Sequence, residues 1–175
     1  MRGPLDVSRE LLALNVAHEI VHLRRRIVAA TGLAEALGVS PAHCVVTELF
    51  ESSLGPVAVL RPIDVTVSTE SLELVTGLSG VRRAGSDVVS DLTDYNAALV
   101  APVGLPASIR SYADSSLGRA DVVYTATGDG GTALKIRIGD LLAVTGALVA
   151  TVANVPGLVT EVPAQIDWRA VESVR

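Results

Sequence analysis

The spacing of apolar residues changes along the chain from a helical period to a strand period. Near the N-terminus, apolar side chains recur on one face of residues 8–16, which predicts a short helix with Ser8 as its N-cap. A second short helix is predicted over 33–37, because Gly38 stands where a helix stop is expected. From residue 44 onward, apolar residues run together or alternate with polar ones, which is typical of strands.

Short strands and short helices follow each other irregularly through the rest of the chain. Strands are predicted over 44–50, 56–61, 81–84, 109–113, 122–126, 134–138 and 148–152, and helices over 69–75, 87–92 and 140–144. The turn at 128–131 favours a hairpin, and 96–106 is predicted to be an ordered loop against the core. The pattern lacks strict βαβ alternation, so it predicts an α+β (mixed α/β) fold. We expect a central, barrel-like mixed β-sheet surrounded by short helices.

Composition narrows the class of protein. The chain has 175 residues, 49% of them hydrophobic, and a net charge of −5, which fits one folded domain and excludes a strongly basic DNA binder. Residues 1–152 are expected to form this domain, and 153–175 a C-terminal extension with a short helix that packs Trp168. A single cysteine, no signal-peptide pattern and no apolar run of membrane-spanning length predict a cytoplasmic protein without a membrane partner.

The segment from His18 to His22 matches the pattern His-Glu-x-x-His. On a helix, the two histidines would bind zinc and Glu19 would act as a general base. The β-branched Ile20 and Val21 also allow a strand, in which the residues alternate across two faces. No companion motif supplies a third ligand. We therefore expect no metal and no other cofactor, and keep a zinc hydrolase using His18, Glu19 and His22 as an alternative.

Several segments, in order, resemble one known family. Residues 33–41 resemble its A-A-E-A-L-G-V-x-P helix, and residues 98–104 resemble its G-x-x-x-P-x-G loop. Shorter stretches at 15–20, 92–95 and 114–117 resemble its G-I-x-Y-E-L, T-G-Y and D-x-S-L motifs. The family is the YbaK / prolyl-tRNA-synthetase-associated aminoacyl-tRNA editing domain. The resemblance covers roughly residues 10–152 and implies a small mixed α/β protein with a barrel-like sheet.

The resemblance also implies a reaction and a site. Such proteins hydrolyse the ester that joins a wrong amino acid to the tRNA 3′ end, so the implied partner is an aminoacylated tRNA terminus. Loop amides hold the acyl carbonyl, a terminal tRNA hydroxyl takes part, and a strand lysine steers the phosphate or ribose. The substrate-binding positions carried over are Thr47, Tyr95, Ala98, Leu99, Val100, Ala101, Pro102, Gly104, Asp114 and Ser115. We expect Thr47, the 98–104 loop and Asp114 to converge on one cleft with inward-pointing amides.

The chain departs from the family pattern at three positions. The family's lysine is Val46 here, and Arg61 on the next strand is the nearest basic residue that could replace it. Two family glycines are Asp94 and Ala98. Three functions therefore stay open: a divergent deacylase that hydrolyses mischarged tRNA esters, a non-catalytic protein that binds a tRNA 3′ end, an amino-acid-like ligand or a protein partner, and the zinc hydrolase.

Overall fold

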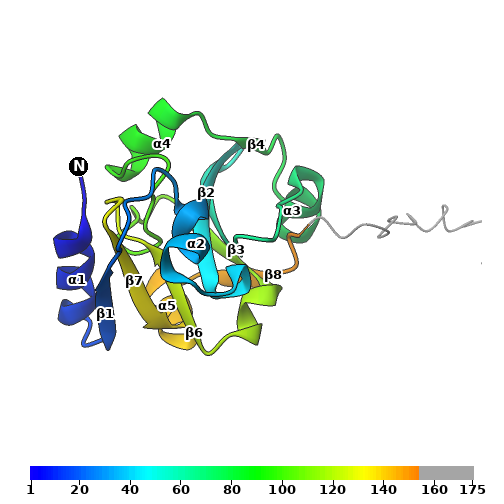
Figure 1. The fold of residues 1–175 in the computed structure, drawn as a ribbon. Coiled ribbons are helices and arrows are strands. Elements are labelled where there is room, and N and C mark those ends of the chain that lie inside the picture. Colours follow the sequence, from blue (N-terminus) through cyan, green and yellow to red (C-terminus); the bar gives the residue numbers. More distant parts are fainter. Residues whose placement is uncertain (154–175) are drawn as a thin grey trace, which may run out of the picture.

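The computed structural model describes residues 1–153, which form a mixed sheet with helices around it (Figure 1). The helices are α1 (Pro4–Ala13), α2 (Leu33–Leu37), α3 (Thr69–Thr76), α4 (Ser86–Thr93) and α5 (Ile138–Thr145), with the 3-10 helices η1 (Ala30–Gly32), η2 (Pro41–His43) and η3 (Ser115–Arg119). The strands are β1 (His18–His22), β2 (Cys44–Ser52), β3 (Gly55–Pro62), β4 (Arg82–Arg83), β5 (Arg110–Asp114), β6 (Val122–Ala126), β7 (Thr132–Arg137) and β8 (Leu148–Ala150).

The sheet is mixed and open. Its strand order is β1-β7-β6-β2-β3-β5-β8, and β4 pairs with β2 beside this path. The β2–β6, β3–β5 and β5–β8 pairs are parallel, whereas the other pairs are antiparallel. The α+β class and the mixed sheet are confirmed. Within residues 1–153 the path ends at β1 and β8, so the sheet does not close into a barrel.

Strand β2 lies in the centre of the sheet and is buried on both faces. Val45 and Leu49 point into the largest hydrophobic cluster, which also holds side chains of α1, α4, α5 and the 96–106 loop. Cys44 and Val46 point to the opposite face, into a cluster with α2 and η1. A strand covered on both faces needs apolar residues at successive positions, which explains the apolar runs 44–46 and 49–50 on either side of Thr47 and Glu48.

Local capping signals explain which helix boundaries were predictable. Helix α3 has the predicted ends: the Ser68 hydroxyl accepts a hydrogen bond from Ser71 N at 3.1 Å, and Gly77 ends the helix at φ 70°. Helix α1 begins at Pro4 rather than at residue 8, because proline suits the first helical position and Gly3 N donates to the Asp6 carboxylate at 2.9 Å. The prediction of Ser8 as N-cap was wrong.

The His18–His22 segment is a strand, so the helical arrangement that the zinc alternative requires does not form. β1 pairs antiparallel with β7, with His18 opposite Ile136. His18 Nδ1 lies 2.9 Å from Val16 O and Nε2 lies 2.9 Å from the Ser8 hydroxyl, so both ring nitrogens already have protein partners. Among residues 1–153, no group of three His, Cys, Asp or Glu side chains is placed to hold a metal ion.

Two further expectations concern membranes and the C-terminus. No helix in the described part of the chain is both long and apolar enough to cross a bilayer. Ala153 forms an isolated bridge with Val67. The predicted helix near 167–174 and Trp168 lie outside the described residues.

Candidate functional site

A cavity of about 260 Å³ opens beside the centre of β2, between η1, the start of α4 and the loop after α4. Three of the sequence-derived positions, Val46, Thr47 and Ala98, line it together. The remaining lining residues come from segments far apart in sequence: Ala29, Ala30, Thr31, Glu48, Leu49, Arg61, Arg83, Ala84, Ser86, Val89 and Ala97. Eight of the fourteen lining residues are apolar, five of them alanines, and the other six are polar or charged.

Thr47 carries a polar group that the fold leaves unpaired. Its side chain is 6% exposed, and Oγ1 has no hydrogen-bond partner among the described residues. Burying a hydroxyl without a partner costs roughly 1–3 kcal/mol, and the cost is recovered when a partner arrives. Thr47 lines the cavity while its Oγ1 atom is closed off from solvent, so a ligand supplies that partner only when the cavity wall adjusts around the hydroxyl.

The charged groups of the cavity form a connected set of three side chains. Glu48 accepts hydrogen bonds from Arg61 Nε at 2.6 Å and from Arg83. Arg61 is 11% exposed and also donates to the carbonyls of Pro62, Ile63 and Val65. Arg61 is thus held in place as a structural cation, with its Nε and Nη1 donors already in use.

The environment keeps Glu48 ionised. Burial by itself would raise the pKa of Glu48, but hydrogen bonds and charge from Arg61 and Arg83 outweigh burial and lower the pKa. A carboxylate with a lowered pKa is a weak base. Glu48 therefore suits an electrostatic role in the cavity better than proton abstraction.

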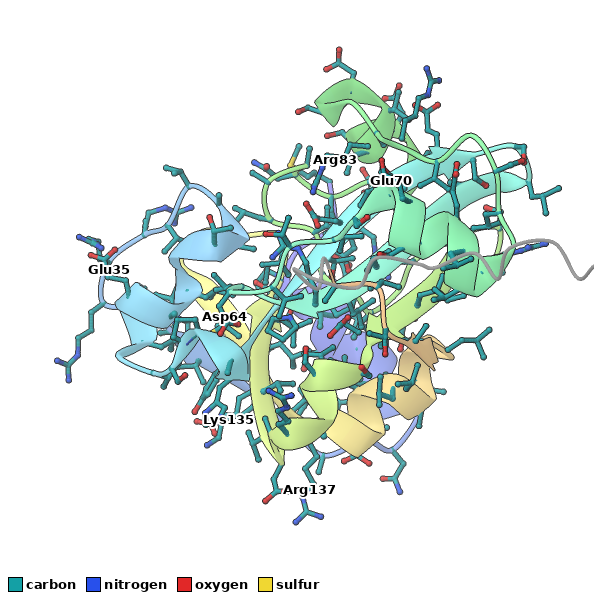
Figure 2. All side chains as sticks on the ribbon, turned by 90° about the vertical axis from the view of Figure 1, so that its right-hand side faces the viewer. Glu35, Asp64, Glu70, Arg83, Lys135 and Arg137 are labelled. Atoms are coloured by element: carbon teal, nitrogen blue, oxygen red, sulfur yellow. The ribbon has the colours of Figure 1, made fainter. Side chains whose placement is uncertain are left out.

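Val46 stands where the resembled family has its lysine, so this position is apolar here. The fold places arginine side chains nearby. Val46 faces Arg61 directly in the β2–β3 register. The single lysine of the chain, Lys135 on β7, lies at the far end of the molecule from Arg83 (Figure 2). Lys135 pairs with Glu19 at 3.0 Å. The cavity therefore depends on arginine for its positive charge.

The loop that begins at Ala98 is held by hydrogen bonds at its start. Ala98 N donates to Asn96 Oδ1 at 3.0 Å, and Leu99 N donates to Asn96 O at 2.8 Å. Ala98 O accepts from Ala30 N at 2.8 Å, which ties the loop to η1. The expectation of inward-pointing amides fails for Ala98 and Leu99, because Asn96 already occupies both.

The rest of the 98–104 loop leaves this cavity and crosses the core. Leu99, Val100 and Ala101 are buried. Pro102 and Gly104 line a second cavity of about 390 Å³, on the side of β5 and α5. The loop therefore separates two cavities instead of surrounding one.

The other sequence-derived positions have structural partners away from the cavity. Tyr95 is buried, its hydroxyl donates to Val103 O at 2.8 Å, and burial raises its pKa to about 12. Asp114 is buried and accepts from Val152 N at 3.1 Å and from Ala153 N at 3.0 Å. Ser115 is exposed and lies 3.0 Å from the Thr151 hydroxyl. Asp114 and Ser115 thus fasten the residues after β8 to the end of β5.

A family model described as the aminoacyl-tRNA editing domain matches residues 26–144. The chain belongs to this family. Among curated proteins, no relative matches the editing domain significantly. The matched range holds every residue that lines the 260 Å³ cavity.

Solved structures share the fold of this editing domain. The hypothetical protein APE2540 is 28% identical with a TM-score of 0.78, over 85% of this chain and 99% of that one. A candidate trans-editing enzyme for prolyl-tRNA synthetase is 24% identical with a TM-score of 0.76, over 85% and 95% of the two chains. A candidate signal transduction protein from Marinobacter aquaeolei VT8 is 16% identical with a TM-score of 0.62, over 85% of this chain and 30% of that one.

Sequence reasoning missed the part of the editing domain's cavity that comes from β4 and α4. Arg82 and Arg83 form a basic pair in the sequence, and such a pair by itself is typical of a solvated surface. The two-residue strand β4 pairs Phe50 with Arg83, and this pairing brings Arg83 to Glu48. A strand of two residues has no periodicity, so only an acidic partner on β2 could have indicated the contact.

Proposed function

We propose that the 260 Å³ cavity is the site where this editing domain hydrolyses the ester between a mischarged amino acid and a tRNA 3′ end. The observation that carries the proposal is the buried, unpaired Thr47 hydroxyl in a cavity that also holds Val46 and Ala98. Membership of the editing family supports this reaction class. The shared fold with a candidate trans-editing enzyme for prolyl-tRNA synthetase agrees with it. Action on charged tRNA would place the protein in the cytoplasm.

The cavity wall favours a small amino acid. Ala29, Ala30, Ala97 and Ala98 contribute methyl groups to a space of about 260 Å³. A pocket of this kind rejects large side chains by exclusion and accepts alanyl or seryl esters. Discrimination between side chains that differ by one methylene is about 1–3 kcal/mol, so neighbouring sizes are separated only about 10- to 200-fold.

The chemistry relies on positioning. A water oxygen attacks the acyl carbon, the bond from that carbon to the ribose oxygen breaks, and the ribose oxygen leaves as a hydroxyl while the amino acid leaves as a carboxylate. Thr47 Oγ1 donates a hydrogen bond to the acyl carbonyl oxygen, on which negative charge develops. Glu48 remains ionised between its two arginines and supplies no proton. Of the two protons of the attacking water, one is relayed through the neighbouring free hydroxyl of the terminal ribose to the leaving ribose oxygen, and the other passes to solvent.

The test is hydrolysis of a panel of mischarged tRNAs by the wild type and a Thr47→Val variant. We expect kcat/KM for the best substrate to fall by roughly 10- to 100-fold in the variant, because one hydrogen bond to a developing charge is lost. Thr125→Val is the matched control, since Thr125 is also a fully buried threonine with an unpaired hydroxyl but does not line the cavity. Equal effects of the two substitutions would contradict the proposed site.

A non-catalytic binding protein is the second candidate, and two observations favour it. Val46 replaces the family's lysine, and the Ala98 and Leu99 amides are already engaged by Asn96. Such a protein would hold an aminoacylated tRNA end, an amino-acid-like ligand or a protein partner without hydrolysis. Absence of ester loss for every mischarged tRNA, together with activity gained by a Val46→Lys variant, would establish this function in place of the enzyme.

A further inference from the structure

We propose that residues 158–162 of this chain dock on the open edge of β8 as an additional antiparallel strand. The segment follows the described residues, which end at Ala153 beside β8 and α3 (Figure 1). The docking does not require ester hydrolysis, so it is independent of the proposed function.

Strand β8 ends the sheet and leaves a row of backbone groups without partners. Within residues 1–153 it pairs only with β5, in parallel. Beyond this ladder, residues 148–151 form no backbone hydrogen bond with the rest of the described chain. A strand directs its N–H and C=O groups to both sides, so the side of β8 away from β5 is open to another strand.

The edge of β8 also lacks the residues that keep an edge strand from pairing. Leu148 is 64% and Val149 is 59% exposed, and consecutive side chains of a strand point to opposite faces. No charged residue and no proline occurs in 141–155. The other end of the sheet differs, because β1 carries the charged Glu19 between polar and apolar residues. An apolar, uncharged edge is a pairing site unless something covers it.

Exposure on both faces of β8 identifies the kind of occupant. A helix or a loop packed on one face would cover either Leu148 or Val149 and leave the other exposed. An added strand covers both, because its own side chains alternate between the two faces in the same way. It also supplies partners for the free backbone groups of the edge. Leu148 lines the cavity of about 390 Å³, so the same strand would form part of that cavity's wall.

Residues 158–162 have the sequence of such a strand. The segment reads Leu-Val-Thr-Glu-Val, which is rich in β-branched residues and has apolar side chains for both faces, since Val159 and Val162 fall on opposite ones. A Pro-Gly turn signal precedes it at 156–157. Pro163 ends it, because proline cannot donate to a ladder. The segment is therefore apolar on both faces, as the edge of β8 is.

The connection is short enough to favour this segment over a second copy of the chain. Ala153 is fixed soon after β8, since its N atom donates to Asp114 Oδ2 at 3.0 Å and it bridges Val67. Residues 154–157 then form a link of the length found in β-hairpin loops. Such a link gives a roughly millimolar effective concentration of the segment at the edge, well above that of another molecule in dilute solution.

The experiment measures hydrogen exchange of the β8 backbone amides in the full chain, by nuclear magnetic resonance. Strand β5 accepts from alternate residues of β8 only, so an open edge leaves the remaining amides of 148–151 in fast exchange. With 158–162 docked, we expect those amides to exchange roughly 10- to 100-fold more slowly than at an open edge, the effect of a few cross-strand pairs. Nuclear Overhauser contacts between α-protons of 149–151 and of 158–162 should also be present, and they need no variant.

Two proline variants test the segment itself. Adjacent amides of a strand point to opposite sides, so at least one of Val159→Pro and Thr160→Pro removes a donor that faces β8. That variant should lose the slow exchange at β8. Ala164→Pro is the matched control, because it makes the same kind of change outside 158–162. It should keep the slow exchange.

Any of three results would overturn the docking: fast exchange of alternate β8 amides in the wild type, no effect of either Val159→Pro or Thr160→Pro, or an equal loss in Ala164→Pro. Slow exchange that disappears on dilution would assign the edge to a second copy of the chain, which overturns the docking as well. None of these measurements involves tRNA. If mischarged tRNAs are not hydrolysed while the slow exchange depends on 158–162, the proposed reaction fails and the docked strand stands.

Discussion

Val46 and Arg61 face each other across the antiparallel β2–β3 ladder, and both line the cavity of the editing domain. Directly opposed residues on one face of a ladder lie about 4.5–5.5 Å apart at their Cβ atoms. The cation nearest to the family's lysine position is therefore a neighbour on the next strand. Because Glu48 and three carbonyls hold Arg61, this neighbour does not simply take over the role of the lysine.

A Val46→Lys variant tests how much catalytic activity the domain lacks because valine stands at the family's lysine position. In a Val46→Lys variant we expect kcat/KM for a small aminoacyl-tRNA ester to rise about tenfold, because a new cation enters the cavity. Stability should fall by about 1–3 kcal/mol, since Val46 is buried and the new charge lies beside Arg61. Val46→Met controls for side-chain length without charge. A rise in activity of similar size in the methionine variant would show that shape, not charge, limits the reaction.

Glu48 should make the free energy of unfolding of the domain depend on pH. Its pKa is lowered in the folded protein, so the stability that it contributes is present above its ordinary pKa and is lost as pH falls through the lowered value. In a Glu48→Gln variant we expect the free energy of unfolding at pH 7 to fall by about 1–3 kcal/mol. The difference from the wild type should shrink toward pH 3.

Denaturant unfolding at several pH values measures this difference directly. Glu51→Gln is the control, because Glu51 pairs with the exposed Arg82 on the same β2–β4 ladder and such pairs contribute little. A pH-independent difference between the wild type and Glu48→Gln would contradict the assigned charge state.

Asp94 occupies a backbone conformation that glycine adopts more easily. It ends α4 at φ 57°, at the position where the resembling family has a glycine. An Asp94→Gly variant should be more stable by about 0.5–1 kcal/mol, since the left-handed conformation is unstrained for glycine. Asp94→Asn should change stability little, because asparagine also tolerates this conformation. Thermal unfolding of the three proteins checks the order, and a glycine variant less stable than the wild type would refute it.

Gly104 allows the N-terminal segment to reach the central loop. Its φ is 74°, and a Cβ at this position would collide with the side chains of Arg2 and Glu10. A Gly104→Ala variant should lose about 1–3 kcal/mol of stability, from the strained φ and from displacement of Arg2 off the Gly104 carbonyl. Gly139→Ala is the control, because a Cβ there meets no atom within 4 Å. Comparable losses in the two variants would contradict this account.

The sequence predicted elements best where short-range chemistry decides the outcome. Ser68 and Gly77 mark the ends of α3, and Gly38 ends α2 at φ 69°. The strand alternative for His18–His22 could not be chosen from local pattern alone, because the pairing partner of β1 is β7, more than a hundred residues later. Tertiary pairing overrides local propensity in such segments.

The site was predictable only in part, for a geometric reason. Val46 and Thr47 adjoin each other on β2, and the start of the resembling loop, Ala98, reaches the same cavity. The prediction that the whole 98–104 loop lines one cleft was wrong. The loop turns into the core after Ala98, and Gly104 lines the second cavity. Ala98 also does not need the freedom of the glycine it replaces, since positive φ among non-glycine residues of 1–153 is confined to Asn15 and Asp94.

The N-terminal elements α1 and β1 lie side by side at one edge of the molecule and precede the matched range 26–144 (Figure 1). Val7 and Leu11 of α1 are fully buried, and β1 covers the outer edge of β7. A protein trimmed to the matched range would uncover this apolar surface and leave the backbone of β7 unpaired. Open strand edges recruit other chains, so such a fragment would tend to aggregate. We therefore expect the unit that folds alone to be larger than the range that the family model matches.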